Sequence, residues 1–279
     1  MLKPHYYHSY FKKIALFLLC VTAAVVGTIA ADKPEKRQLR NVVMLGDSIT
    51  WLGGDDCSQE KGWTKWFAEL SGPGTYHSYA RSGATMSNNG KTTANTTENI
   101  GTLGDNNVVY NQVLRLREDL QKGKIKAPNL VIIAAGANDA WFYTKRPDLF
   151  SLPVEGAFRK DAATLTALKP SDVGSLAESL RQNILLIREV LPNTRIIVMT
   201  PLQTSRIPAE RLAKTADILE QTARKLGADV IRQDRVCPVR AADERRKYSL
   251  TYDGIHTSVL GARLNGQAIS HAVDSILSL

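Results

Sequence analysis

Four short blocks of the chain carry residue types that together could transfer an acyl group through a serine. In chain order they are Gly46-Asp47-Ser48-Ile49-Thr50, Gly83, Gly136-Ala137-Asn138-Asp139 and Asp253-Gly254-Ile255-His256. A serine hydroxyl becomes a useful nucleophile only beside a base. The charge that develops on an attacked carbonyl oxygen needs fixed hydrogen-bond donors. Each block alone is also typical of a turn or a helix cap, but the four together indicate a nucleophile, a base and an oxyanion hole.

His256 is the best candidate for the base that would activate Ser48. Of the five histidines, two lie in the N-terminal segment, one in an expected strand and one in an expected helix. Asp253 lies three residues before His256, and in a helical turn that spacing would put both side chains on one face. The carboxylate would then accept the Nδ1 proton and direct Nε2 toward Ser48. The alternative is a surface histidine at the start of a helix.

Asn138 and Gly83 are the candidate oxyanion donors. Asn138 follows the clearest of the expected buried strands, so its side-chain amide could donate to a developing oxyanion. Gly83 could offer a bare backbone N–H to the same place. The alternatives are a helix-capping asparagine, a role that Asp139 could share, and a simple turn glycine.

The spacing of apolar residues predicts alternating strands and helices. Short continuous apolar runs predict buried strands over residues 41–45 and 129–135. We expect three further strands, over residues 75–80, 195–200 and 228–231. Helical spacing predicts helices over residues 63–70, 108–120, 172–190, 208–226 and 259–279. Ser171 or Asp172 would cap the third helix, and Gly227 would end the fourth. We expect an exposed loop over residues 86–107 and a long insertion over residues 141–171.

This alternation predicts an α/β fold, in which helices cover both faces of a parallel sheet. Ligands of such folds bind at the edge where the carboxyl ends of the strands lie. Ser48, Gly83 and Asn138 each follow an expected strand. We therefore expect all three to lie at that edge.

The four blocks resemble those of the SGNH/GDSL hydrolase superfamily, and the resemblance covers residues 41–264. It implies a flavodoxin-like three-layer α/β/α sandwich with a five-stranded parallel sheet. It implies that the catalytic residues are Ser48, Asp253 and His256. It also implies an oxyanion hole made by the backbone amides of Ser48 and Gly83 and the side chain of Asn138. The Gly-x-Ser-x-Gly nucleophile elbow, which would favour the α/β-hydrolase fold, does not occur in the chain.

The resemblance further implies a serine ester hydrolase, in a superfamily that includes lipases, lysophospholipases and carbohydrate esterases. The residues expected to line the substrate site are Asp47, Trp51, Trp141 and Phe142. Flat aromatic rings can stack on sugar rings, although such rings also form lid cores or acyl pockets. We expect deacylation, above all deacetylation, of a carbohydrate ester. The alternatives are a lipid or lysophospholipid acylhydrolase and an O-acetyltransferase acting on a cell-wall sugar. The intact triad argues against a non-catalytic glycan-binding protein.

The N-terminus has the pattern of an export signal. Lys12 and Lys13 precede an apolar run over residues 14–31, which ends in small residues before Asp32. We expect residues 1–31 to be a cleaved signal peptide, with an uncleaved membrane anchor as the alternative. Residues 32–279 would then form one hydrolase domain, secreted or periplasmic, that touches a membrane only if the anchor remains.

The charge and the cysteine content indicate which partners, cofactors and disulfides to expect. The formal net charge is +9, or +6 without the three lysines of residues 1–31, and it is spread along the chain. We therefore expect no nucleic-acid partner. Cys57 and Cys237 are a disulfide candidate in an oxidising compartment, the alternative being two free buried thiols. Because the cysteines and histidines form no cluster, we expect no metal and no other cofactor.

Overall fold

The computed structural model describes residue 39, residues 41–87 and residues 108–278. The chain divides near residue 37 into two units, and the fold belongs to the second of them. The signal segment predicted over residues 1–31 and most of the loop predicted over residues 86–107 lie outside the described residues. A single domain over residues 32–279 stays a prediction.

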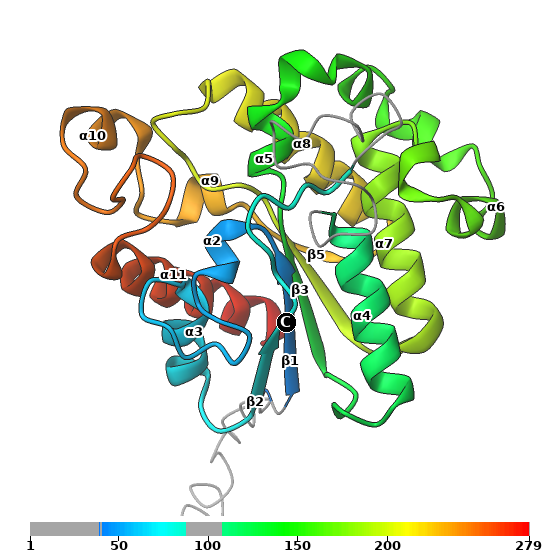
Figure 1. Cartoon of the computed structure of the whole chain (residues 1–279), viewed down its shortest axis with the longest axis horizontal. Coiled ribbons are helices and arrows are strands. Elements are labelled where there is room, and N and C mark those ends of the chain that lie inside the picture. Colours follow the sequence, from blue (N-terminus) through cyan, green and yellow to red (C-terminus); the bar gives the residue numbers. More distant parts are fainter. Residues whose placement is uncertain (1–38, 40, 88–107, 279) are drawn as a thin grey trace, which may run out of the picture. The chain divides into compact units, whose positions relative to one another are not determined.

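Five parallel strands form one sheet in the order β2-β1-β3-β4-β5 (Figure 1). The strands are β1 (Asn41–Gly46), β2 (Thr75–Ser78), β3 (Leu130–Ala134), β4 (Arg195–Met199) and β5 (Asp229–Ile231). Every residue of β3 is buried, because helices cover the sheet on both sides. The prediction of a five-stranded parallel sheet is confirmed, and β2 is shorter than expected.

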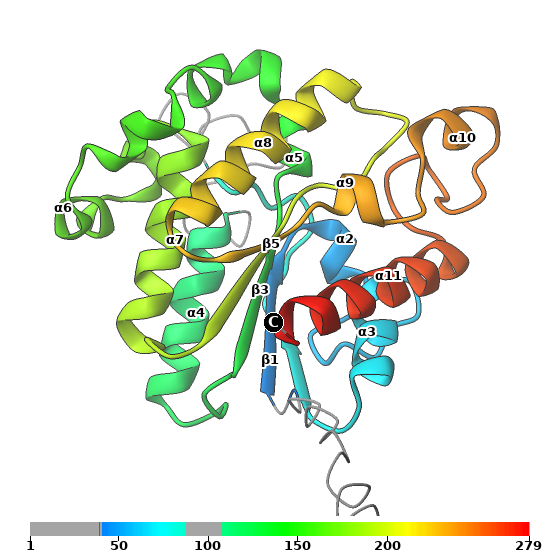
Figure 2. The same ribbon diagram turned by 180° about the vertical axis from the view of Figure 1, so that it is seen from behind.

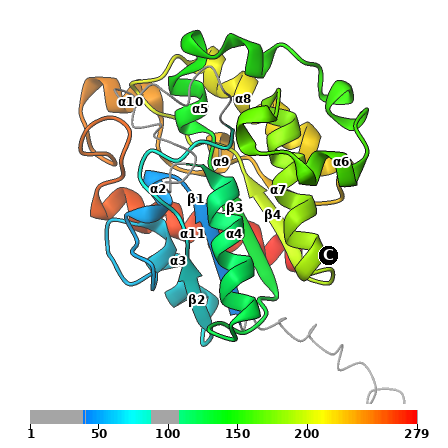
Figure 3. The same cartoon turned by 45° about the vertical axis from the view of Figure 1, so that its right-hand side comes forward.

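Helices cover both faces of the sheet (Figures 1 and 2). One layer contains α4 (Val109–Gln121), α7 (Leu176–Val190) and α8 (Ala209–Lys225), and the other contains α3 (Trp63–Ser71) and α11 (Val259–Leu277). Side chains alternate along a strand. Accordingly, Val43 and Leu45 pack with the first layer, and Val42 and Met44 pack with the second. Figure 3 shows α4 and α7 side by side against the sheet. This is the three-layer α/β/α sandwich that the sequence predicts.

The helix predicted from residue 172 begins later, at Leu176. Ser171 and Asp172 belong to a 3₁₀ turn, η5 (Pro170–Asp172). The cap is Ser175, whose hydroxyl accepts a hydrogen bond from the Glu178 amide at 3.1 Å. The prediction of a cap at Ser171 or Asp172 is wrong, because Ser175 offers the same capping chemistry closer to the first apolar turn.

Several short helices have no counterpart in the apolar pattern. They are α2 (Ser48–Trp51), α5 (Ala137–Trp141), α9 (Gln233–Val236) and α10 (Ala241–Arg246). The insertion predicted over residues 141–171 contains η2 (Tyr143–Lys145), η3 (Pro147–Phe150), η4 (Val154–Phe158), α6 (Ala162–Ala167) and η5. Elements of this length show too few turns for a period to be visible. Within residues 41–87 and 108–278, no helix is long and apolar enough to cross a bilayer.

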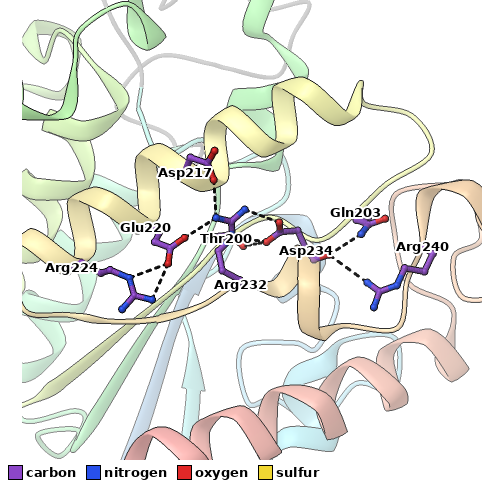
Figure 4. Close-up of polar contacts among 8 residues, drawn as sticks. All are labelled: Thr200, Gln203, Asp217, Glu220, Arg224, Arg232, Asp234 and Arg240. Carbon is purple, nitrogen blue, oxygen red and sulfur yellow. Dashed lines mark hydrogen bonds and ion pairs between the residues drawn. The ribbon is translucent and has the colours of Figure 1, made fainter.

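A cluster of ion pairs ties the segments after β4 and β5 to α8 (Figure 4). Arg232 donates to Asp217 and Glu220 of α8, each at 2.7 Å. It also donates to Asp234 of α9 at 2.8 Å. Asp234 in turn accepts a hydrogen bond at 2.8 Å from the hydroxyl of Thr200, the residue after β4. These contacts fix two neighbouring strand ends at the edge where the sequence predicts the site.

Candidate active site

Ser48, His256 and Asp253 form a continuous chain of hydrogen bonds. Ser48 Oγ lies 2.9 Å from His256 Nε2, although 208 residues separate the two in the sequence. His256 Nδ1 lies 2.6 Å from Asp253 Oδ2. In this arrangement a carboxylate orients an imidazole, and the imidazole can take the proton of a hydroxyl. The geometry therefore allows nucleophilic chemistry at Ser48.

Ser48 opens the short helix α2 directly after Asp47. The Asp47 side chain caps this helix by accepting a hydrogen bond from the Ile49 amide at 3.1 Å. Only 3% of Asp47 is exposed. The carboxylate is thus buried beneath the helix that it caps, and the expectation that Asp47 lines the substrate site stays a prediction. Burial raises the pKa of Asp47 to about 7, against the opposing effects of the Ile49 amide and of His256.

Gln112 of α4 fixes the end of β1 by bonding both backbone groups of Gly46. Its Nε2 donates to the Gly46 carbonyl at 2.8 Å, and its Oε1 accepts from the Gly46 amide at 2.7 Å. A Cβ added at Gly46 would lie 2.5 Å from the Ala134 carbonyl oxygen, so only glycine allows β1 to end this close to β3. These contacts hold the backbone that leads into Ser48.

The segment that carries Asp253 and His256 is a loop of bends, not the helical turn considered from the sequence. Asp253 Oδ1 accepts hydrogen bonds from the amides of Ile255 at 2.9 Å and His256 at 2.7 Å. One carboxylate oxygen thus shapes the loop while the other holds the imidazole. Burial acts to raise the pKa of Asp253, but the hydrogen bonds from His256 and Ile255 outweigh it and keep the pKa below its ordinary value.

Gly83 and Asn138 lie in two segments that contact each other at this edge. Gly83 has a φ of 76°, a left-handed conformation that favours glycine. Asn138 Nδ2 donates to the carbonyl of Ala84, the next residue along, at 2.9 Å. A side-chain amide has two N–H groups, so Asn138 can bond Ala84 and still donate to a substrate oxygen.

Two buried residues lock the segment after β2 onto α5. Asp139 accepts hydrogen bonds from the Met86 amide at 2.7 Å, and from the Ser87 amide at 3.2 Å and hydroxyl at 3.0 Å. Arg146 donates to the Ser87 carbonyl at 2.8 Å. From the sequence, Asp139 is expected only as a helix cap, and no sequence pattern singles out Arg146. Their partners belong to a distant segment, so no local pattern could have indicated them.

Two of the aromatic residues expected to line the substrate site are exposed. The exposed fractions of Trp51 and Trp141 are 43% and 42%. Trp51 follows Ser48 by three residues in α2, and Trp141 follows Asn138 by three residues in α5. At this spacing the Trp51 indole shares a helix face with Ser48, and the Trp141 indole shares one with Asn138. Phe142 is half-buried, and the guanidinium of Arg146 lies over its ring, 5.3 Å from the ring centre.

Cys57 and Cys237 are two free, buried thiols. Cys57 Sγ lies 3.8 Å from Met44 Sδ, whereas Cys237 follows α9 and lies beside Gln233. This corrects the disulfide candidate. Both side chains belong to one apolar cluster, but each has its own partner, Met44 for Cys57 and Gln233 for Cys237, and no bond joins the two sulfur atoms. Burial raises the pKa of each thiol to about 12.

Within the described parts of the chain, no three histidine, cysteine, aspartate or glutamate side chains gather as metal ligands would.

A model of the GDSL-like Lipase/Acylhydrolase family matches residues 44–264. The chain is similar in structure to an acetyl xylan esterase, AlAXEase, with a TM-score of 0.53 and 16% identity over 83% of this chain and 98% of that one. A possible lipase from Chitinophaga pinensis DSM 2588 gives a TM-score of 0.52 and 17% identity over 84% of this chain and 98% of that one. A carbohydrate acetylesterase family member from Sinorhizobium meliloti gives a TM-score of 0.51 and 16% identity over 86% and 100% of the two chains. At these identities the likeness concerns the fold. No curated protein matches the chain.

Proposed function

Since the chain belongs to the GDSL-like lipase/acylhydrolase family and is a carboxylic ester hydrolase, we propose that Ser48 is its nucleophile, His256 its general base and Asp253 the residue that orients the base. The main support is the pair of contacts at 2.9 Å and 2.6 Å that joins the three side chains. The low pKa of Asp253 adds to it, since an ionised carboxylate stabilises the imidazolium that forms during the reaction.

In the first half of the proposed reaction, His256 Nε2 takes the proton of Ser48 Oγ as this oxygen attacks the ester carbonyl. The tetrahedral intermediate carries a negative oxygen, for which we assign the backbone amides of Ser48 and Gly83 and the side chain of Asn138 as donors. The imidazolium then gives its proton to the leaving alcohol, and an acyl group remains on Ser48.

In the second half, water attacks the acyl group on Ser48. His256 takes a proton from this water and returns it to Ser48 Oγ when the acid leaves. The imidazole therefore acts twice as base and twice as acid, and the enzyme ends in its starting state. A sugar hydroxyl in place of water would give an O-acetyltransferase, and product analysis with a sugar acceptor distinguishes the two.

We assign the substrate to the acylated carbohydrates, with acetate as the acyl group. Two of the similar structures are named as an acetyl xylan esterase and a carbohydrate acetylesterase family member. The exposed indoles of Trp51 and Trp141 offer flat apolar faces to a sugar ring. A lipid or lysophospholipid acylhydrolase would instead need a continuous apolar surface for its acyl chain.

A substrate screen tests this function, with Ser48→Ala as the control. We expect the protein to release acetate from acetylated xylan and to act more slowly on lysophospholipid. Ser48→Ala should lose hydrolysis by a factor on the order of 10⁶ and should lose labelling by a fluorophosphonate probe, with its far-ultraviolet circular dichroism unchanged. An alanine variant that kept a tenth of the wild-type turnover would exclude Ser48 as the nucleophile. A preference for lysophospholipid would favour the lipid alternative.

We also propose that residues 1–31 direct the chain out of the cytoplasm. The lysines followed by an apolar run and small residues support this. N-terminal sequencing of the protein recovered from the periplasm or the medium should give a first residue near Asp32. Recovery of the full-length chain from membranes would instead support an uncleaved anchor.

A further inference from the structure

A groove of about 640 Å³ lies beside the end of α2. Its volume falls in the range of small-molecule sites, roughly 300–1,000 Å³. Its lining includes Trp51, Asp55, Gln59, Glu60, Lys61 and Val259. We call it the Trp51 groove. It does not contain the nucleophile, but Trp51 is the last residue of the helix that Ser48 opens.

The Trp51 groove adjoins the imidazole side of the site. Lys61 Nζ lies over the ring of Tyr252, 5.8 Å from its centre. The Tyr252 ring stacks on the His256 imidazole, with the two centres 5.7 Å apart and the planes at 16°. The Thr257 hydroxyl donates to the Lys61 carbonyl at 2.9 Å. The groove wall is therefore bonded to the loop that carries His256.

The walls of the Trp51 groove are held by their own backbone contacts. The Gln59 amide donates to the Gly53 carbonyl at 2.9 Å, and the Gly62 amide donates to the Gln59 carbonyl at 3.2 Å. A Cβ added at Gly62 would lie 2.1 Å from the Gly53 nitrogen, so the two ends of the loop touch through glycine. The Trp66 indole donates to the Glu60 carbonyl at 3.0 Å. The groove is thus preformed, which lowers the cost of binding.

The direction of proton transfer decides which half of an ester this groove can receive. The imidazolium gives its proton to the leaving oxygen, so the alcohol half of the ester must lie on the imidazole side. The proposed oxyanion donors Gly83 and Asn138 come from the segments after β2 and β3, whereas the groove is formed by the segment after α2 and the start of α11. The groove is therefore placed for the alcohol.

The lining of the Trp51 groove fits one kind of alcohol. An exposed indole offers a flat apolar face, while Gln59, Glu60 and Lys61 offer an amide, a carboxylate and an ammonium group. A hydrocarbon chain would leave these polar groups without partners. A sugar ring has an apolar face and a rim of hydroxyl groups, so it can use both the indole and the polar side chains.

We propose that the Trp51 groove is the subsite for the sugar unit that carries the ester, with the ring stacked on Trp51 and its hydroxyls bonded by Gln59 and Glu60. This proposal rests on the function proposed above and adds which residues recognise the alcohol half.

The test compares esters that differ in one half only. Acetylated xylo-oligosaccharides and ethyl acetate share the acyl group, and ethyl acetate and ethyl butyrate share an alcohol too small to fill the groove. Acid release is followed in a pH-stat with wild type, Trp51→Ala and Gln59→Ala. Leu114→Ala is the control, since Leu114 is an exposed apolar residue of α4, in the other helix layer. Circular dichroism and probe labelling establish that each variant is folded.

Trp51→Ala should raise KM for the acetylated oligosaccharide about tenfold more than KM for ethyl acetate, a change of roughly 1.4 kcal/mol. Gln59→Ala should change the same ratio in the same direction, and Leu114→Ala should not change it. An equal rise of KM for the acetylated oligosaccharide and for ethyl acetate in Trp51→Ala would overturn the subsite alone. A change in the ratio of KM for ethyl butyrate to KM for ethyl acetate instead would overturn it too. A wild-type protein that cleaves ethyl acetate but no acetylated oligosaccharide would overturn the proposed carbohydrate substrate, and the subsite with it.

Discussion

Glu244 accepts hydrogen bonds from both the amide and the hydroxyl of Thr251, two residues before Asp253. The same carboxylate accepts from the Leu250 amide at 2.9 Å, and the Thr251 hydroxyl accepts from the Gly254 amide at 3.1 Å. Only 1% of Glu244 is exposed. Burial acts to raise its pKa, but these donors outweigh it and keep the pKa below its ordinary value. A buried anion therefore organises the loop that carries Asp253.

Glu244→Ala should slow the reaction without weakening substrate binding. The donors that Glu244 satisfies would lose their acceptor, which costs about 1–3 kcal/mol for each buried group. The loop would then hold Asp253 and His256 less precisely, and we expect kcat to fall by roughly 10²-fold, since small displacements of reacting groups have effects of that size. KM should change little. The assay is run below the melting temperature of the variant.

Glu244→Gln is the matched variant, because it keeps the shape and one acceptor oxygen. It should recover part of the lost kcat and part of the lost rate of fluorophosphonate labelling. A purely structural role predicts loss of stability with normal turnover by the molecules that remain folded. Wild-type kcat in folded Glu244→Ala would therefore exclude Glu244 as a positioning residue.

Asn138→Ala should lower kcat by about 10²–10³-fold with little change in KM, because a bond to the oxyanion strengthens mainly in the transition state. The substitution also removes the donor to the Ala84 carbonyl. Asn138→Asp is the matched control of similar size, and an ionised carboxylate cannot donate to an oxyanion, so it should be as slow. Steady-state kinetics with one ester substrate measure both. An effect confined to KM would identify Asn138 as a substrate-binding residue instead.

The sequence predicts the centre of the sheet well because β1, β3 and β4 are short, mostly apolar runs that are buried along nearly their whole length. The same rule cannot find α2 or α5, whose four and five residues complete little more than one turn. The positions of Ser48 and Asn138 could still be predicted, since each follows a strand and parallel strands end at one edge.

The residues that hold the site in place are harder to predict. One feature of the sequence indicates a role for Gln112: it lies on the apolar face of α4 with Val109, Val113 and Leu116. A polar side chain buried there needs a hydrogen-bond partner. No feature of the sequence indicates the role of Glu244, because its partners are mostly backbone amides of a loop that has no periodic sequence pattern. The pairing of Cys57 with Cys237 failed for a similar reason: an even number of cysteines says nothing of where the two side chains point.

Both of these cysteines should be recovered as free thiols. Burial raises the pKa of Cys57 and of Cys237 to about 12, so neither forms an appreciable amount of thiolate at pH 8. The folded protein should react slowly with iodoacetamide. After unfolding in guanidinium without reductant, mass spectrometry should find both peptides alkylated. A peptide pair joined through sulfur in the unreduced protein would contradict the structure.

Asp47→Asn should remove a loss of stability that the wild type suffers as the pH rises. The folded protein holds the Asp47 pKa at about 7, raised from 3.8 mainly by burial, with Asp139 adding to the rise and His256 opposing it. Between these two values the unfolded chain releases a proton that the folded chain keeps. The stability that this group contributes is therefore complete below pH 4 and is lost as the pH rises toward 7, by at most about 4 kcal/mol.

Asparagine caps a helix as well as aspartate does, so the variant keeps the bond to Ile49 without titrating. Urea unfolding at pH 4, 5.5 and 7 should show the variant gaining on the wild type across this range, and a constant difference between the two proteins would show that Asp47 ionises normally.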